Sequence, residues 1–191
     1  MIYVIGPSGA GKDSLLNGLR NGLAGMDTPL PLYFAKRTIT RSHHQSNENH
    51  ESVDESTFES MLHNNAFALN WFANGLHYGI RHSELSQMHA GKWVMVNGSR
   101  AYLEEAKKRF PGLTVLHITA PKEVLRTRLL MRGRESAQDI EARLNRPQSL
   151  APEPPDLCLL NEGSLEESLG TLKKLLHQHT STYSKNTGHI E

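Results

Sequence analysis

The sequence lacks the features of disulfide-rich, membrane-spanning and strongly charged proteins. Its 191 residues contain one cysteine, which excludes an intrachain disulfide framework and favours a reducing compartment. No apolar run is long enough to span a bilayer. Lysine and arginine total 21 and aspartate and glutamate total 20, and the net charge of +1 gives no general attraction to nucleic acid or to anionic membranes. We therefore expect a cytoplasmic protein whose partners are small molecules, and the oligomeric state stays open.

The apolar runs of the chain are short and typical of a globular core. The lone cysteine, Cys158, lies inside the run Leu157–Leu160, where a buried and unreactive thiol is expected. The run Ile2–Ile5 is typical of a core strand and not of a cleavable signal. A chain of 191 residues can bury a sizeable core, and its length suits one domain with elaborations.

The stretch Gly6–Ser14 has the spacing G-x-x-x-x-G-K of a phosphate-binding P-loop. It follows the apolar run Ile2–Ile5 and precedes a helical pattern, which is the order of strand, loop and helix that such a loop requires. Glycines let the backbone bend so that its N–H groups converge on a polyphosphate. The helix N-terminus and the Lys12 ammonium add positive charge. The sequence therefore predicts a polyphosphate site at this loop.

The residue after Lys12 departs from the P-loop pattern, because Asp13 stands where serine or threonine is usual. The usual hydroxyl contacts Mg²⁺, and a carboxylate is a favoured ligand of this hard cation. Asp13 is therefore a candidate Mg²⁺ ligand, with Ser14 as a rival. Alternatively, Asp13 only complements the positive end of the helix that begins here.

Apolar runs that alternate with helical patterns predict an α/β fold. This alternation is typical of a mostly parallel sheet with helices on both faces. The expected strands are residues 2–5, 32–35, 93–96, 113–118 and 157–160. The expected helices are residues 12–23, 54–62, 83–89, 100–110, 136–144 and 164–177, and a further helix that begins near Pro121 and ends at Gly133.

The remaining segments predict a small insert, a lid and a tail. Asn74 and Gly75 indicate a hairpin, which with the helix at 54–62 forms an insert beside the main sheet. Residues 42–52 are polar and predict a loop, and residues 180–191 predict a frayed end. The expected single domain comprises a core of 1–35, 91–131 and 147–178, an insert of about 36–90, a helical lid of about 132–146 and a tail of 179–191.

The order of these parts resembles the guanylate kinase family of P-loop nucleoside-monophosphate kinases. Besides the P-loop, Thr38-Ile39-Thr40-Arg41 is similar to the acceptor-phosphate motif of that family, and the series from Phe58 to Tyr78-Gly79 is similar to its acceptor insert. The segment from Arg132-Gly133-Arg134-Glu135 to Arg143-Leu144 matches the fixed positions of the family's lid pattern. Asn161 stands where a loop of the family approaches adenine.

The resemblance implies phosphoryl transfer from ATP to a phosphate monoester, with Mg²⁺ as cofactor. Such a transition state spreads negative charge over the transferred group, so that positioned cations dominate catalysis. Lys12, Arg132 and Arg143 are the expected catalytic cations, although arginines on a helix are often only a solvated face. Arg134 is also a candidate to lie over the adenine. The residues expected to bind ATP are Gly6, Pro7, Ser8, Gly9, Ala10, Gly11, Lys12, Asp13, Ser14, Arg134 and Asn161.

The acceptor half departs from the family pattern at the positions that read guanine. Arg37 and Ile80 replace serines, and Asn70 replaces a glutamate. The acidic residues that end the middle strand are replaced by Asn97-Gly98. A site built on hydrogen bonds loses discrimination steeply when their partners are removed. Guanine recognition is therefore not expected.

These replacements remove negative groups and add a positive one, so the pocket suits an anion in place of a base. Arg41 and Tyr78 are expected to hold the accepting phosphate and Arg37 a second phosphate; with Asn70 they are the expected substrate-binding residues. The implied acceptor is a small sugar carrying two phosphates, as in a branch of the family that shares the Gly-Lys-Asp form of the loop. A nucleoside-monophosphate kinase with an unusual base preference and a non-catalytic interaction module are the alternatives.

The eleven histidines of the chain do not form a recognisable metal motif. His43, His44 and His50 lie close together in sequence but lack the spacing of metal ligands. His117 is expected to be a buried histidine of a central strand, and Trp71 a core residue of the insert.

Overall fold

The computed structural model describes residues 1–22, 30–41, 50–133, 136–145 and 154–187. The chain divides into two compact units. The first unit contains residues 1–5, 31–115 and 151–154. The second unit contains residues 6–30, 116–150 and 155–191. The P-loop and the acceptor segment therefore belong to different units.

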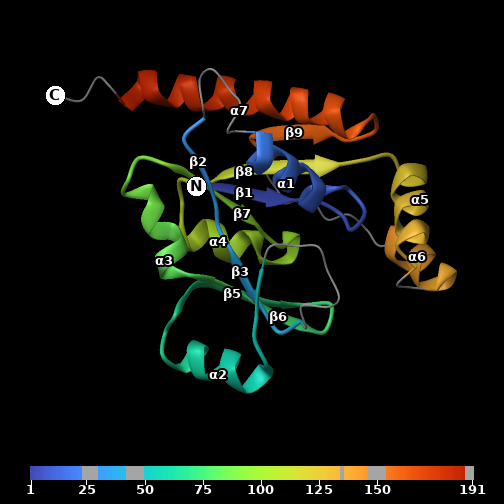
Figure 1. Cartoon of the computed structure of the whole chain (residues 1–191), viewed down its shortest axis with the longest axis horizontal. Coiled ribbons are helices and arrows are strands. Elements are labelled where there is room, and N and C mark those ends of the chain that lie inside the picture. Colours follow the sequence, from blue (N-terminus) through green and yellow to red (C-terminus); the bar gives the residue numbers. More distant parts are fainter. Residues whose placement is uncertain (23–29, 42–49, 134–135, 146–153, 188–191) are drawn as a thin grey trace. The chain divides into compact units, whose positions relative to one another are not determined.

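In the main sheet, the pairs β1–β7, β2–β7 and β8–β9 are all parallel (Figure 1). Its strand order is β2-β7-β1-β8-β9. These strands are β1 (Ile2–Ile5), β2 (Leu32–Phe34), β7 (Trp93–Asn97), β8 (Thr114–Thr119) and β9 (Leu157–Leu160). The order is not sequential, and its parallel neighbours are joined by crossover connections and not by hairpins. The α/β fold expected from the alternating pattern is confirmed.

A smaller, mixed sheet lies within the first unit. Its strand order is β4-β3-β6-β5. These strands are β3 (Arg37–Ile39), β4 (His50–Ser52), β5 (Phe67–Ala73) and β6 (Leu76–Arg81). β5 and β6 form the expected hairpin, and Asn74 and Gly75 have φ values of 51° and 74°, as a tight hairpin turn requires.

One hydrophobic core joins the elements of the first unit. Buried side chains of β1, β7, β5 and β6 pack together with Leu85, Leu103 and Ala106, which lie on two short helices. The helices are α2 (Glu55–His63), α3 (His82–Leu85), η3 (Ser86–Met88), η4 (Arg100–Tyr102) and α4 (Leu103–Arg109). Trp71 is 8% exposed and stacks on Tyr78, so its predicted core role is confirmed.

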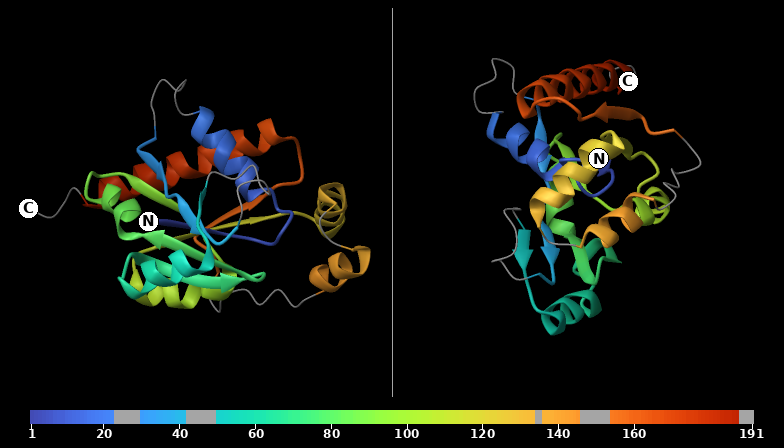
Figure 2. Two further views of the ribbon diagram at one scale, coloured as in Figure 1. Left: turned by 60° about the horizontal axis from the view of Figure 1, so that its bottom comes forward. Right: turned by 90° about the vertical axis from the view of Figure 1, so that its right-hand side faces the viewer.

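The described residues of the second unit form four helices, which Figure 2 shows from two further directions. They are α1 (Lys12–Gly22), α5 (Lys122–Arg132), α6 (Ala137–Leu144) and α7 (Leu165–Thr187). α1 packs against α7, α7 against β9, and α5 against α6. Gly133 ends α5 with a φ of 62°, which confirms the predicted break.

Two sequence predictions about secondary structure are wrong. His50–Ser52 is not loop but strand β4, parallel to β3, while residues 42–49 lie outside the described residues. α7 does not end at His177 but continues to Thr187. Thr180 is buried, so a side chain of this polar segment is packed and the segment is not left frayed in solvent at this point.

The prediction for Cys158 is also wrong, because this thiol is exposed. β9 is the terminal strand of the sheet order, and successive side chains of a strand point to opposite faces. Leu159 is 2% exposed, whereas its neighbours Cys158 and Leu160 face solvent. His117, which pairs with Cys158 in the β8–β9 register, is buried as predicted.

Within the described part of the chain, no helix combines the length and apolar character needed to cross a membrane. No group of three or more histidine, cysteine, aspartate or glutamate side chains in these residues is arranged to hold a metal ion. His43 and His44 lie outside the described residues.

Candidate functional site

The P-loop of the second unit is shaped by its glycines. Gly6, Gly9 and Gly11 have φ values of 154°, 85° and 82°, a region that other residues rarely adopt. A Cβ on Gly6 would lie 1.9 Å from the backbone oxygen of Ile118, so a side chain is excluded there. The loop therefore has the backbone form that lets successive N–H groups face an anion.

The Lys12 ammonium lies across its own loop. Its Nζ donates to the backbone oxygens of Gly6, at 2.8 Å, and Pro7, at 3.0 Å. These contacts hold a full positive charge at the start of α1, where the helix N-terminus adds a partial one. The arrangement is a ready site for phosphate oxygens, as the sequence predicts.

Asp13 and Ser14 follow Lys12 in the first turn of α1. The Asp13 side chain is half-buried, whereas Ser14 is exposed. A Mg²⁺ ion in a kinase site is commonly held by one or two carboxylates together with the phosphates of the substrate. The Asp13 carboxylate therefore has the chemistry of a Mg²⁺ ligand and stands beside the loop.

Helix α5 packs directly against the P-loop. A Cβ on Gly9 would lie 3.2 Å from the Leu125 backbone oxygen and 3.2 Å from Cγ of Leu129. A Cβ on Gly11 would lie 3.7 Å from Nη1 of Arg128. This Nη1 is buried and has no hydrogen-bond partner among the described residues. Arg128 is therefore a cation that faces the loop.

The contact of Arg128 with the loop is not predicted from the sequence. A signal was available, because Arg128 precedes Arg132 by four residues and so shares its face of α5. Arg132 is exposed at the end of that helix. Arg143 is half-buried in the last turn of α6, and Arg134 lies outside the described residues.

Arg126 links α5 to α6 and has a structural role. Its Nε donates to the Glu141 carboxylate at 2.5 Å, and its Nη2 donates to the other oxygen of that carboxylate at 3.0 Å. Arg126 also pairs with Glu123 one turn earlier. The guanidinium lowers the pKa of Glu141 below its ordinary value. The helix that carries Arg143 is thus joined to α5 by a bidentate ion pair.

Asn161 lies beneath the P-loop, directly after β9. It is 4% exposed. Its Nδ2 donates to the Ala10 oxygen at 2.7 Å, and its Oδ1 accepts from the Ser168 hydroxyl at 2.8 Å. Both polar atoms of the amide are therefore engaged within the second unit.

In the first unit, Arg37, Arg41 and Tyr78 come together on one face of the small sheet. Arg41 Nη2 donates to the Tyr78 hydroxyl at 3.3 Å, and the Arg37 guanidinium carbon lies 5.8 Å from the centroid of the Tyr78 ring. The register explains this, because Tyr78 pairs with Ile39 and Arg37 with Ile80. Residues paired across two strands share a face, as do alternate residues of one strand, so Arg37 accompanies Tyr78; Arg41 follows two residues after the end of β3.

Asn70 is not brought together with these residues. It pairs with Gly79, one position away from the pair of Trp71 and Tyr78. Since adjacent residues alternate between faces, the Asn70 side chain points to the opposite face from Tyr78. It is half-buried there.

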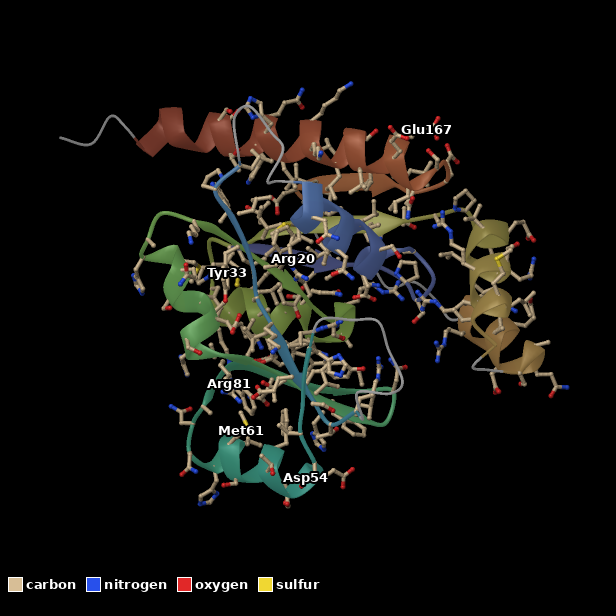
Figure 3. The ribbon with its side chains drawn as sticks, viewed as in Figure 1. Arg20, Tyr33, Asp54, Met61, Arg81 and Glu167 are labelled. Carbon is tan, nitrogen blue, oxygen red and sulfur yellow. The ribbon has the colours of Figure 1, made fainter. Side chains whose placement is uncertain are left out.

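A polar network occupies that opposite face. Glu51 accepts from the Thr38 hydroxyl at 2.8 Å and from Arg81 at 2.5 Å. Arg81 Nη2 also lies 4.0 Å from the Met61 sulfur of α2, and Figure 3 labels both residues. The network ties β3 to β4, β6 and α2, and the sequence analysis did not predict it because β3 and β4 were not expected.

The end of β7 is neutral and tightly packed. Asn97 is 7% exposed, and its backbone oxygen accepts from Arg37 Nη1 at 3.4 Å. A Cβ on Gly98 would lie 2.1 Å from Cζ of Tyr3, whose hydroxyl accepts from the Ser99 amide at 3.1 Å. Burial raises the pKa of Tyr3, which therefore stays a neutral hydrogen-bonding group. Arg37 thus reaches the strand end where the guanine-reading acids are absent.

Comparison with known proteins identifies similar sequences. No protein-family model matches the chain. Ribose 1,5-bisphosphate phosphokinase PhnN of Laribacter hongkongensis is 46% identical over 179 residues, which are 94% of this chain and 43% of that protein. The protein of the same name from Pseudomonas paraeruginosa is 42% identical over 174 residues, which are 90% of this chain and 92% of that protein. The chain thus spans less than half of the first relative and nearly all of the second.

The fold is also similar to that of a solved structure. The crystal structure of guanylate kinase from Anaplasma phagocytophilum matches with a TM-score of 0.66 at 16% identity, covering 94% of this chain and 85% of that chain. At this identity the likeness shows the fold alone. It agrees with a P-loop α/β fold whose central sheet is mostly parallel.

Proposed function

The chain belongs to the ribose 1,5-bisphosphate phosphokinase family, and on that premise we propose that it transfers the γ-phosphoryl group of ATP to the 1-phosphate of ribose 1,5-bisphosphate. The products are 5-phosphoribosyl 1-diphosphate and ADP. One observation in the molecule carries the proposal, namely the convergence of Arg37 and Arg41 on Tyr78. Guanidinium groups bind phosphate oxygens through charge-assisted and often bidentate hydrogen bonds, so this cluster suits an acceptor with more than one phosphate.

In the proposed reaction, an oxygen of the 1-phosphate attacks the γ-phosphorus of ATP. The bond from that phosphorus to the β–γ bridging oxygen breaks, and its electron pair leaves with ADP. Arg41 and the Tyr78 hydroxyl hold the accepting phosphate, while Arg37 holds the 5-phosphate. Positioning of this kind supplies most of the catalysis, because the transition state makes little covalent demand on the protein.

On the donor side, the P-loop amides and Lys12 hold the β- and γ-phosphates of ATP. Arg132 and Arg143 neutralise the charge that spreads over the transferred group. We add Arg128 to this set, because its buried Nη1 faces Gly11 of the loop. A cation that is already desolvated interacts strongly with a phosphate oxygen.

Mg²⁺ would be held by Asp13 together with the phosphate oxygens of ATP. When bound, it supplies charge neutralisation across the β- and γ-phosphates. The half-buried carboxylate of Asp13 stands at the start of α1, next to Lys12. We place the reaction in the cytoplasm, because its donor is ATP and the single cysteine leaves no disulfide framework.

The residues around the acceptor cluster argue against a nucleobase. Ile80 is fully buried, so the position that carries a base-reading serine in guanylate kinases offers only apolar surface within the core. The basic Arg37 reaches the neutral end of β7. A second phosphate matches the positive charge that Arg37 brings to this face, whereas a purine base carries no negative charge.

A coupled assay of ADP formation tests the proposal. Equal concentrations of ribose 1,5-bisphosphate and GMP are compared as acceptors, and the sugar bisphosphate is expected to give the far higher kcat/KM. A preference for GMP would establish a nucleoside-monophosphate kinase instead. Absence of turnover with either acceptor, together with unimpaired folding, would indicate a non-catalytic module.

A further inference from the structure

We propose that Asn161 is a positioning residue that fixes the conformation of the P-loop from beneath, and that it does not contact the nucleotide. The inference rests on the proposed function in one respect, namely that the loop binds ATP. It differs from the role near adenine that the family resemblance implies. The evidence is that both polar atoms of the Asn161 side chain already have partners within the protein.

The backbone of Asn161 is anchored first. Its N–H donates to the Thr119 oxygen at the end of β8, at 2.7 Å. This bond holds the Asn161 backbone at the carboxyl end of β8. The loop that follows leads into α7, whose first turns carry Ser168. Asn161 thus stands where β8, β9 and α7 meet within the second unit.

The amide of Asn161 is held in one orientation. The Ser168 hydroxyl donates to Oδ1 at 2.8 Å, which turns Nδ2 toward the loop. Nδ2 then donates to the Ala10 oxygen at 2.7 Å. Ser168 is 5% exposed and Asn161 is 4% exposed, so water does not compete for these bonds.

The bond to Ala10 determines which way the next N–H points. In a trans peptide the C=O and the following N–H point in opposite directions. Since the Ala10 oxygen is held toward Asn161, the Gly11 N–H points to the other side of the loop. That orientation gives a donor for phosphate and keeps a carbonyl oxygen away from it.

The space at Gly11 supports the same conclusion. A Cβ on Gly11 would lie 2.5 Å from Nδ2 of Asn161, so the loop and the amide are in direct contact. Gly11 has a φ of 82°, which its glycine backbone permits without strain. Asn161 therefore holds a peptide that would otherwise have freedom to rotate.

The substitution Asn161→Asp tests this role through pH. A protonated carboxyl group can still donate to the Ala10 oxygen, whereas an ionised one repels that oxygen and the nearby phosphates. Burial raises the pKa of such a carboxyl group. ADP affinity, measured by calorimetric titration, is expected to be roughly tenfold weaker than wild type at pH 8, in line with the loss of one buried hydrogen bond. Affinity is expected to recover towards the wild-type value at pH 6.

Further variants separate positioning from packing. Ser168→Ala frees the amide to rotate and is expected to weaken ADP binding by a smaller factor, about threefold. Thr180→Val removes the hydroxyl bond of another buried side chain of α7 and serves as the matched control. It is expected to lower the melting temperature and to leave ADP affinity unchanged. If Asn161→Asp does not fold, the comparison of Ser168→Ala with Thr180→Val decides the question.

The outcomes are distinct. Unchanged ADP affinity in Asn161→Asp, or in Ser168→Ala where the first variant does not fold, overturns the inference. An affinity loss that is equal at pH 6 and pH 8 also overturns it, because packing alone is insensitive to protonation. A wild-type protein that binds no ADP would refute the nucleotide site itself, and with it the proposed function.

Discussion

The proposed nucleotide part of the second unit and the proposed acceptor part of the first unit are specified in different ways. The P-loop is specified by its backbone, since glycines with positive φ and a buried amide fix the directions of its N–H and C=O groups. The acceptor cluster is specified by side chains, since the β3–β6 register decides which of them share a face. Backbone sites tolerate few residue types and leave a motif. Side-chain sites change with single substitutions, and this makes the acceptor part the place where specificity can diverge.

The largest loss of turnover is expected from a substitution in the nucleotide part. Lys12→Ala removes the ammonium that lies across Gly6 and Pro7, and turnover is expected to fall by about 10²–10³-fold, as for other preorganised donors. Steady-state ADP formation is the measurement. Lys108→Ala, an exposed lysine that pairs with Glu105, is the control and is expected to keep full turnover. Near-wild-type turnover in Lys12→Ala would contradict a catalytic role of the P-loop lysine.

A smaller effect is expected in the acceptor part. Arg37→Ser restores the family's residue and is expected to raise the KM for ribose 1,5-bisphosphate about tenfold, since a charge-assisted bond to phosphate is lost. The KM for ATP is expected to stay unchanged. Arg109→Ser is the matched control, because Arg109 also donates to a backbone oxygen of the first unit, that of Ala68. An unaltered bisphosphate KM in Arg37→Ser would show that the second phosphate lies elsewhere.

A third prediction concerns Asp13 and the dependence of activity on Mg²⁺ concentration. Asp13→Asn keeps the size of the side chain but removes its charge, and the Mg²⁺ concentration for half-maximal activity is expected to rise roughly threefold. Asp13→Thr restores the usual hydroxyl of the motif and gives the reference. The assay is ADP formation against Mg²⁺ concentration. Identical Mg²⁺ dependence in the wild type and both variants would leave Asp13 with only a role at the helix terminus.

The smallest effect concerns the link between α5 and α6. Arg126 lowers the pKa of Glu141 below its ordinary value of 4.5, so the pair stabilises the fold at neutral pH and loses this contribution as the pH falls below that value. Glu141→Gln is expected to lower the melting temperature at pH 7 by about 1–2 °C, as an exposed ion pair does. Thermal unfolding of both proteins is measured from pH 7 to pH 3, where the two curves are expected to converge. A constant difference across this range would contradict the ion pair.

The same contrast explains how much of the molecule the sequence predicts. The P-loop, the hairpin at Asn74-Gly75 and the helix break at Gly133 depend on local backbone conformation, and all of them are confirmed. β3 and β4 contain 3 residues each, too few for a periodic pattern, so they were missed. Without these strands the faces of the small sheet could not be assigned, and the position of Asn70 could not be foreseen.

Long-range contacts account for most of the rest. Asn161 meets Ala10 across 151 positions in sequence, and no local pattern indicates that contact. Arg128 is different, because its spacing from Arg132 was visible but gave no reason to prefer the loop over solvent. The predicted set of arginines and tyrosine in the acceptor part was nonetheless brought together, since Arg37, Arg41 and Tyr78 do meet.

The exposed thiol of Cys158 on β9 is a site at which a fluorescent dye can be attached. Cys158 is the single cysteine of the chain and faces solvent, so a maleimide dye would react at one defined place without any mutation. β9 runs on to Asn161, which is bonded to the P-loop. A dye on Cys158 would therefore stand three residues before Asn161, the residue bonded to the P-loop, and its fluorescence can be recorded during an ADP titration without any substitution.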